Sequence, residues 1–162
     1  MKMERLARAV GVAVLAVGLF SSGLGAQEAP EAAVLEVVTR LFDGMREKDE
    51  AKLRSVFHAD ARLHTAVPDP SGEPLTRETP VESFINNVAG AEVYIDEVTF
   101  EEVVLVDGNL AMAWTPYNVF VDGAFQHCGV DVFIMTMTPD GWKILQLADT
   151  RRREGCDPER RG

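Results

Sequence analysis

Three Asp-Gly pairs divide the second half of this chain, at Asp107-Gly108, Asp122-Gly123 and Asp140-Gly141. Runs rich in β-branched and aromatic residues flank each pair. Asp-Gly between such runs is a strong hairpin signal, because the favoured two-residue turn needs a positive φ at both central positions. The pattern therefore predicts four consecutive antiparallel strands between about residues 93 and 150.

The turns also predict which residues lie opposite one another. The first two pairs suit two-residue loops, and Pro139-Asp140-Gly141 suits a three-residue loop with glycine in the left-handed position. Counting back along the strands places Asp131 between Trp114 on one side and Asp149 on the other. The expected opposing pairs are Val106–Asn109, Val121–Ala124, Thr138–Trp142, Asp131–Trp114, Asp131–Asp149, Gly129–Arg151 and His127–Asn118.

Side chains alternate across a sheet, so this register predicts two faces. One face carries Met112, Trp114, Asn118, Phe120, Phe125, His127, Asp131, Phe133, Met135, Leu145, Leu147 and Asp149. The other carries Ala111, Ala113, Thr115, Tyr117, Val119, Cys128, Val130, Val132, Ile134, Ile144 and Ala148. Large apolar side chains with a few acids on the first face predict a concave, helix-covered pocket. A homodimer interface accounts for the second apolar face.

The first half of the chain predicts helices packed on this sheet. From Ala32 onward, apolar residues recur at spacings of three and four, which indicates an amphipathic helix. Asp49 can cap a second, shorter helix. Residues 61–67 alternate as a strand, and the proline-rich residues 68–74 predict a loop without regular structure.

A third helix is expected after this loop. Thr79 suits the N-cap, Pro80 the first helical position and Glu82 the acid of a capping box. Gly90 is expected to end the helix. The order is helix, helix, strand, helix and a four-strand meander, which is the pattern of a single α+β domain.

The first 26 residues are typical of a secretory signal peptide. A basic start with Lys2, Arg5 and Arg8 precedes an apolar run from Val10 to Phe20 and a stretch of small residues. Removing this segment, of net charge +2, takes the formal charge from −10 to −12. Such acidity argues against nucleic acid or anionic membranes as partners. We expect a periplasmic or extracellular protein without stable membrane insertion after cleavage.

The two cysteines, Cys128 and Cys156, allow a single intramolecular pairing. Disulfides persist outside the cytoplasm, so a bridge is expected, with free thiols as the alternative. The bridge would fold residues 152–156 back over the sheet. We expect the domain to span residues 27–156 and a disordered tail to span residues 157–162.

Two stretches carry a resemblance to a known group of proteins: His127-Cys128-Gly129, and Asp140-Gly141-Trp142-Lys143-Ile144 through Asp149 to Cys156. With the element order, they resemble a bacterial secreted subgroup of the nuclear transport factor 2-like superfamily, which includes SnoaL-like and lumazine-binding-like proteins. The resemblance covers roughly residues 32–156. It implies an α+β cone, in which a curved, mostly antiparallel sheet wraps around three helices and leaves a cavity, often in a dimer. The fold hosts enzymes and binding proteins alike.

Asp131 and Asp149 are the leading candidates for chemistry. Two carboxylates opposed on a half-buried face repel each other, so one should hold a proton more tightly, as acid–base catalysts do. The alternative is a structural ion pair in which Arg151 neutralises Asp131. His127 and His64 lie on strands and could reach the cavity as proton shuttles or as structural residues.

The sequence predicts a small-molecule-binding protein. Asp131, Asp149 and His127 are candidate catalytic residues, and the expected partner is a small apolar or amphipathic molecule. The alternative is an acid–base enzyme of isomerase, dehydratase or cyclase type that uses Asp131 or Asp149. No cofactor is expected, nor a metal site, since residues four apart on a strand are ~13 Å apart. The candidate ligand-binding residues are Met112, Trp114, Asn118, Phe133 and His64.

Overall fold

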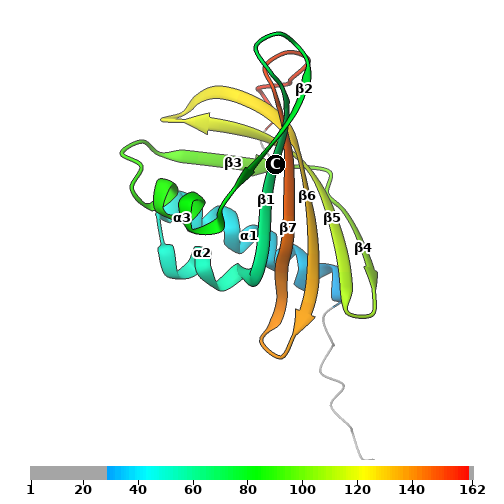
Figure 1. The fold of residues 1–162 in the computed structure, drawn as a ribbon. Coiled ribbons are helices and arrows are strands. Elements are labelled where there is room, and N and C mark those ends of the chain that lie inside the picture. Colours follow the sequence, from blue (N-terminus) through cyan, green and yellow to red (C-terminus); the bar gives the residue numbers. More distant parts are fainter. Residues whose placement is uncertain (1–28, 161–162) are drawn as a thin grey trace, which may run out of the picture.

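A curved sheet and three helices form an α+β cone in the computed structural model, which describes residues 29–160 (Figure 1). The helices are α1 (Pro30–Glu47), α2 (Glu50–Val56) and α3 (Val81–Ala89). The strands are β1 (Phe57–Pro68), β2 (Pro74–Thr79), β3 (Ile95–Thr99), β4 (Val103–Asp107), β5 (Leu110–Val121), β6 (Ala124–Thr138) and β7 (Gly141–Arg152). The predicted signal peptide lies outside the described residues.

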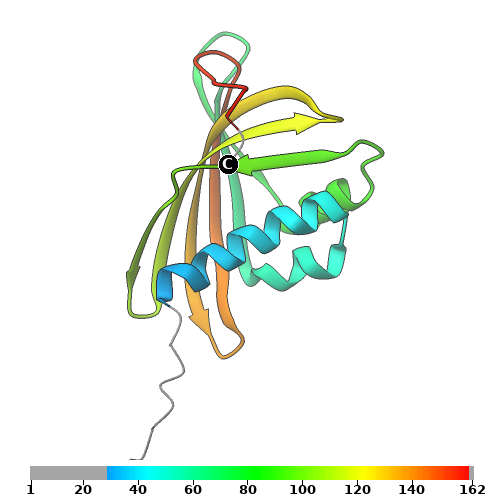
Figure 2. The same cartoon turned by 180° about the vertical axis from the view of Figure 1, so that it is seen from behind.

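The helices cover the concave face of the sheet, and α1 runs diagonally across it (Figure 2). The apolar stripe of α1 is buried, as its spacing predicts; it comprises Val34, Val38, Leu41, Phe42 and Met45. Lys48 then adopts the left-handed conformation and ends the helix. The predicted cap of α2 is confirmed, because Asp49 accepts a hydrogen bond from the Lys52 backbone N–H at 3.0 Å.

The sheet has the strand order β2-β1-β7-β6-β5-β3, with β4 pairing beside β3 on β5. All neighbours are antiparallel except β1 and β7, which run parallel. The first strand of the expected meander is in fact two strands, β3 and β4. The chain breaks between them at Glu101, whose φ is 53°. Both halves pair with the long strand β5.

Two further predictions about the first half are wrong. The proline-rich stretch is a loop only as far as Glu73, because β2 begins at Pro74 and pairs with β1. The expected capping box does not form either. Thr79 is the last residue of β2, paired with Leu63, and Pro80 is the N-cap of α3 without a side-chain cap. Helix α3 does end before Gly90, as expected.

Strand β6 contains one extra residue that the turn count does not reveal. Val121 pairs with Ala124 and Phe120 with Phe125, but Val119 pairs with His127, so Gln126 forms a β-bulge. Beyond the bulge every partner on β5 is shifted by one, and Asp131 lies opposite Thr115 rather than Trp114. Because side chains alternate, this shift exchanges the two faces of β5 relative to the prediction.

A second bulge, at Leu145 in β7, corrects a different error. Thr138 pairs with Gly141 rather than with Trp142, so the predicted count starts one residue out of register. The extra residue at Leu145 restores it. Asp131 therefore lies opposite Asp149, as predicted, and Ile144 joins the core instead of the outer face.

The loop between β4 and β5 also differs from the expected pairing of Val106 with Asn109. Val106 pairs with Ala111, and Asp107 with Leu110. Gly108, with φ 56°, therefore opens the two-residue loop rather than closing it.

The predicted disulfide joins Cys128 to Cys156, with the two Cα atoms 5.9 Å apart. It folds the chain after β7 back over the outer face of the sheet. Residues 157–160, expected as part of a disordered tail, make defined contacts there: the Asn118 side-chain amide donates to the carbonyl oxygens of Asp157 and Arg160. Arg160 also lies over the Phe100 ring.

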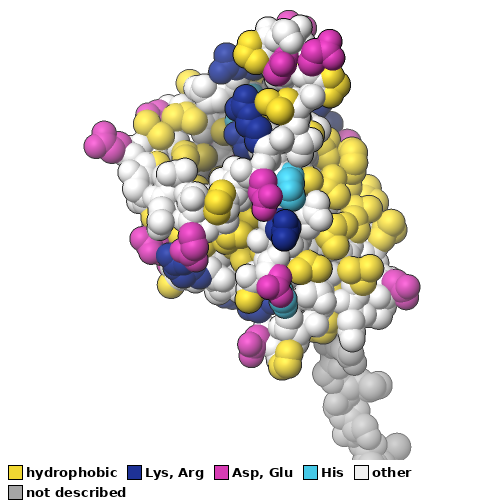
Figure 3. Space-filling view, in the orientation of Figure 1, with side chains coloured by type: hydrophobic (Ala, Val, Ile, Leu, Met, Phe, Trp, Pro, Cys, Tyr) yellow, Lys and Arg dark blue, Asp and Glu magenta, His cyan; other side chains and the backbone are white. Residues whose placement is uncertain are grey.

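The outer face of β4 and β5 exposes large apolar side chains, visible as a continuous patch beside β6 in Figure 3. Val103 pairs with Trp114 and Leu105 with Met112, so these residues lie on one surface. Trp114 is 46% exposed and Leu105 is 60% exposed. In the described part of the chain, no helix is long and apolar enough to span a bilayer.

Candidate functional site

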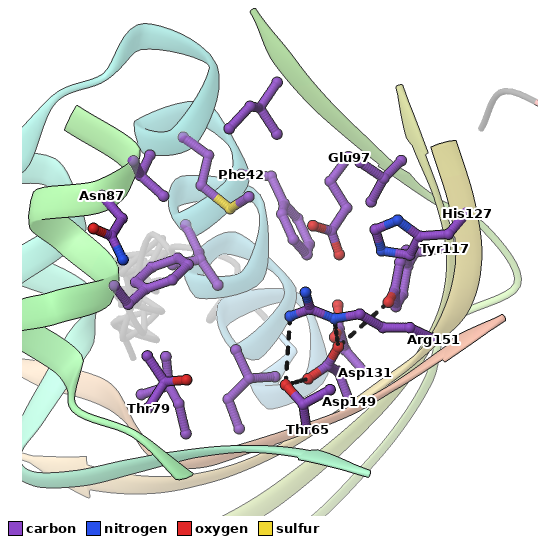
Figure 4. A pocket seen from close by; sticks show the side chains of 18 of the residues that line it. Phe42, Thr65, Thr79, Asn87, Glu97, Tyr117, His127, Asp131, Asp149 and Arg151 are labelled. Carbon is purple, nitrogen blue, oxygen red and sulfur yellow. Dashed lines mark hydrogen bonds and ion pairs between the residues drawn. The ribbon is translucent and has the colours of Figure 1, made fainter. Parts of the chain in front are cut away.

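A cavity of about 440 Å³ lies between the helices and the concave face of the sheet (Figure 4). Its volume is in the range typical of small-molecule sites. Helices α1 and α3 and neighbouring strands provide an apolar wall, and β1, β3, β5, β6 and β7 provide most of a polar one. The apolar lining comprises Leu41, Phe42, Met45, Leu63, Phe84, Val88, Ile95, Val119, Val121 and Leu147. The polar lining comprises His64, Thr65, Thr79, Asn87, Glu97, Tyr117, His127, Asp131, Asp149 and Arg151.

Asp149 is held in a hydrogen-bonded ion pair at one side of the polar wall (Figure 4). Its Oδ1 accepts from the Thr65 hydroxyl at 2.6 Å, and its Oδ2 accepts from Arg151 Nε at 2.6 Å. Arg151 Nη2 also lies 3.4 Å from Thr65 Oγ1. Two of the lone-pair sites of Asp149 are thus occupied by protein donors, so this carboxylate is a positioned counter-ion for Arg151.

Asp131 is buried beside Asp149 but lacks a comparable set of partners. It is 4% exposed, and its Oδ2 accepts no hydrogen bond from an N–H or hydroxyl donor of the described residues; its side-chain hydrogen bond is with Glu97. Glu97 reaches the same point from β3, which pairs with the opposite side of β5. The polar wall therefore contains two neighbouring carboxyl groups besides the ion-paired Asp149.

Glu97 and Asp131 hold a proton between them near neutral pH. Burial raises the pKa of Glu97 from 4.5 to about 7; its hydrogen bond with Asp131 lowers this pKa and the charge of Asp149 raises it. Burial, then the charge of Glu97 and the hydrogen bond with it, raise the pKa of Asp131 well above the usual value. Two carboxyl groups this close cannot both ionise in a desolvated site, so one stays protonated.

Tyr117 and His127 complete the polar wall. The Tyr117 hydroxyl donates to the Thr150 carbonyl oxygen at 2.8 Å and lies 3.5 Å from Asp149 Oδ2. Burial, followed by the charge of Glu97, raises the pKa of Tyr117, so the phenol stays protonated. The His127 ring meets the Tyr117 ring edge-on at 5.8 Å. Burial, followed by the charge of Arg151, lowers the pKa of His127, which favours its neutral form.

This geometry can be compared with known proteins. A model of the family described as putative lumazine-binding matches residues 29–147. The chain belongs to this family. The matched region contains α1 through most of β7 and every residue of the polar wall except Asp149 and Arg151. A search of the curated proteins finds no match for this chain.

Solved structures share the fold at low identity. The β subunit of a putative aromatic-ring-hydroxylating dioxygenase from Novosphingobium aromaticivorans is 12% identical, with 79% of this chain and 92% of that chain covered and a TM-score of 0.62. A putative dehydratase of the nuclear transport factor 2-like family from Streptomyces avermitilis is 19% identical, with 75% and 95% covered and a TM-score of 0.55. The expected resemblance to the nuclear transport factor 2-like superfamily is therefore confirmed for the fold.

The cavity brings together four of the predicted site residues: Asp131, Asp149, His127 and His64. Phe133 lies on the same face but deeper, where its ring packs edge-on against Phe42 at 6.2 Å. The shared face predicted for Met112, Trp114 and Asn118 is wrong, because the Gln126 bulge turns these residues to the outer side of the sheet. There Trp114 is exposed and Asn118 holds the C-terminal segment.

The same bulge explains why the sequence does not predict Tyr117 in the cavity, because the uncorrected register puts it on the outer face. Glu97 pairs with Val119 in a short strand without polar and apolar alternation, so no sequence signal marks its face. Knowledge of the bulge position would have found Tyr117 but not Glu97. The alternative interpretation, in which Arg151 forms an ion pair with Asp131, is wrong in its partner, because Arg151 pairs with Asp149. No group of three or more potential ligands suited to a metal ion occurs within residues 29–160.

Proposed function

We propose that this protein binds a small amphipathic molecule in the cavity, with its polar end against Glu97 and Asp131 and its apolar body against α1 and α3. The observation that carries this proposal is the cavity itself, in which the carboxyl groups of Glu97 and Asp131 lie in one lining with the apolar side chains of α1 and α3. No N–H or hydroxyl of the described residues donates to Asp131 Oδ2, so a ligand donor at this pair adds a hydrogen bond that the protein does not make, worth about 0.5–1.5 kcal/mol. Molecules of lumazine size and polarity are reasonable first probes, given the family description.

The cavity rim on α3 offers a matched pair of variants to test binding. Asn87 lines the cavity, whereas the exposed neighbour Asn86 does not. A panel of small amphipathic molecules would first be screened by the rise in thermal midpoint that binding produces. Asn87→Trp should abolish that rise by filling the entrance, and Asn86→Trp should keep it. Equal binding by both variants would place the ligand elsewhere and contradict the proposal.

Acid–base catalysis is a second candidate function, favoured by the proton that Glu97 and Asp131 share. A base whose pKa lies near 7 beside a protonated acid is suited to isomerisation or dehydration at neutral pH. Here Glu97 would accept a proton from the ligand and Asp131 would donate one. The neutral Tyr117 phenol is already committed to Thr150. Asp149, the base expected from the sequence as the alternative to Asp131, is engaged by Arg151 and Thr65.

Deuterium exchange tests this candidate without knowledge of the product. Each molecule found to bind would be incubated with the protein in deuterated water and examined by proton NMR. The catalytic candidate predicts loss of a carbon-bound hydrogen signal with the wild type and none with Glu97→Gln. If no bound molecule exchanges hydrogen with the wild type, the protein is a binder and not a catalyst of this kind.

We further propose that the mature protein works outside the cytoplasm as a homodimer. The N-terminal sequence pattern and the Cys128–Cys156 bridge support the location. The exposed apolar patch on β4 and β5 supports the dimer, since a patch of this kind on a soluble protein marks an interaction site.

A further inference from the structure

The described residues that line the cavity carry more negative than positive groups. Three have carboxyl groups, namely Glu97, Asp131 and Asp149, and one, Arg151, has a guanidinium. Arg151 is paired with Asp149 through the 2.6 Å hydrogen bond described above. Within this lining, Glu97 and Asp131 are thus left without a cation of their own. A proton bound to the pair partly neutralises its negative charge.

The cations packed around this pair do not supply the missing charge. Arg46 of α1 donates to the backbone oxygen of Glu97 at 3.3 Å, but its charge is balanced by Asp43 and Asp96. His127 is kept neutral by burial and by Arg151, which lower its pKa. The carboxyl pair therefore faces the cavity with an uncompensated charge whenever its proton is lost.

The other polar groups of the lining are uncharged or directed elsewhere. His64 Nε2 lies 4.0 Å from a carboxylate oxygen of Glu78, which belongs to β2. The Thr65 hydroxyl donates to Asp149. Asn87 and Thr79 offer neutral groups near α3. A ligand that approaches the Glu97–Asp131 pair thus meets carboxyl oxygens to which no described N–H or hydroxyl is committed.

We propose that the cavity selects a small organic ammonium ion, whose charged N–H group contacts the Glu97–Asp131 pair and whose apolar body lies against α1 and α3. This inference rests on the proposed binding function and names the class of ligand. An ammonium group donates charge-assisted hydrogen bonds, which are about twice as strong as neutral ones. The rings of Phe42, Phe84 and Tyr117 in the same lining favour a cation as well.

Binding of an ammonium ion must displace the proton of Glu97. The bound cation stabilises the ionised carboxylate of Glu97, so the proton that Glu97 holds at slightly acid pH passes to the buffer, while Asp131 keeps its own proton. Near pH 6, below the Glu97 pKa of about 7, close to one proton should leave for each ligand bound. Above pH 8 the release should fall toward zero for Glu97, because its carboxylate is already ionised.

Three ligands with one apolar body separate charge from shape: cyclohexylmethylammonium, cyclohexylmethanol and cyclohexanecarboxylate. Calorimetry at pH 6 in two buffers of different ionisation enthalpy gives the affinity and the number of protons released. We expect the ammonium ion to bind at least about tenfold more tightly than the alcohol, as a desolvated charge pair would. Carboxylate binding should be the weakest of the three.

Glu97→Gln tests the assignment of the charge, with Glu92→Gln as the matched control in the exposed segment before β3. The first variant should lose the preference for ammonium over alcohol and the proton release, while the second should keep both. Tighter binding of the alcohol or the carboxylate would overturn the ammonium inference but leave the proposed binding function intact. Absence of binding by all three would overturn the inference, and the wider panel with Asn87→Trp would then decide the proposed function.

Discussion

Gly129 leaves the space in which Tyr117 lies beside the acids. The two residues pair across β5 and β6, and a Cβ at residue 129 would lie 1.9 Å from the Thr150 oxygen and 2.7 Å from the Tyr117 hydroxyl. Thr150 lies on β7, so its backbone oxygen cannot move without disturbing the ladder between β6 and β7. The identity of one small residue thus permits the phenol to point into the polar wall.

Gly129→Ala should therefore destabilise the fold by about 3 kcal/mol, in the upper range of overpacking costs. Gly90→Ala is the control, since its φ of −85° suits alanine and its nearest contact, the Asn86 backbone oxygen at 3.1 Å, is tight but needs a shift of only a few tenths of an ångström. Urea denaturation of both variants measures the difference. Equal stability of Gly129→Ala and the wild type would show that the Tyr117 pocket is looser than described.

The raised pKa of Glu97 makes the stability of the protein depend on pH. Between its unfolded pKa of 4.5 and its folded pKa of about 7, the folded state binds more protons than the unfolded state. Stability must then fall as pH rises through this window, by at most roughly 3.5 kcal/mol at about 1.4 kcal/mol per unit. Glu97→Gln removes this contribution.

The difference in unfolding free energy between Glu97→Gln and the wild type should thus shift in favour of the variant from pH 5 to pH 8. Denaturant titrations at several pH values measure it, and subtraction cancels the titrating groups that do not interact with Glu97. A difference that is constant with pH would contradict the buried, protonated pair.

At the scale of elements, local sequence signals predicted most of the fold, and the exceptions have a common cause. The amphipathic spacing of α1, the Asp49 cap and the presence of a turn at each Asp-Gly pair depend on neighbouring residues, so they can be read from the chain, although the pairing was predicted correctly only at Asp122-Gly123. The Gln126 bulge, the Leu145 bulge and the break between β3 and β4 depend on how distant strands fit together. Asp131 and Asp149 were placed correctly only because the second bulge offsets the error at the third turn.

The disulfide is the element that fixes the chain after β7. Cys128 and Cys156 are 28 residues apart, and closing a loop of that length stabilises the fold by about 3–4 kcal/mol on the chain-entropy model. Reductant should lower the thermal midpoint of the wild type accordingly and should leave a Cys128→Ser/Cys156→Ser variant unchanged. If reductant leaves the thermal midpoint of the wild type unchanged, the segment from residue 153 is held by its other contacts, such as those of Asn118.

At the scale of the whole molecule, the sheet separates two surfaces with different tasks. The concave face forms the cavity, and the outer face of β4 and β5 carries exposed Trp114 and Leu105. Because side chains alternate, a change on one surface should leave the other intact. The two proposals, ligand binding and dimer formation, can thus be tested independently.

Leu105→Glu should convert the proposed dimer to a monomer while ligand binding persists, because a buried unpaired charge is costly at an interface. Leu75→Glu is the control, as Leu75 is an exposed apolar residue on β2, remote from β4 in the strand order. Light scattering after size exclusion measures the mass. A monomeric wild type, or a dimer in both variants, would exclude this patch as the interface.

The account as a whole depends on Glu97 and Asp131 sharing a proton at the polar wall of one cavity. Carbon-13 NMR of the side-chain carboxyl carbons, followed from pH 4 to pH 9, reports each titration directly. We predict that Glu97 titrates with a midpoint near pH 7 and that Asp131 titrates well above the usual aspartate range. If both carboxyl groups titrate independently below pH 5, they are separate solvated acids, and the proposed ligand site is wrong.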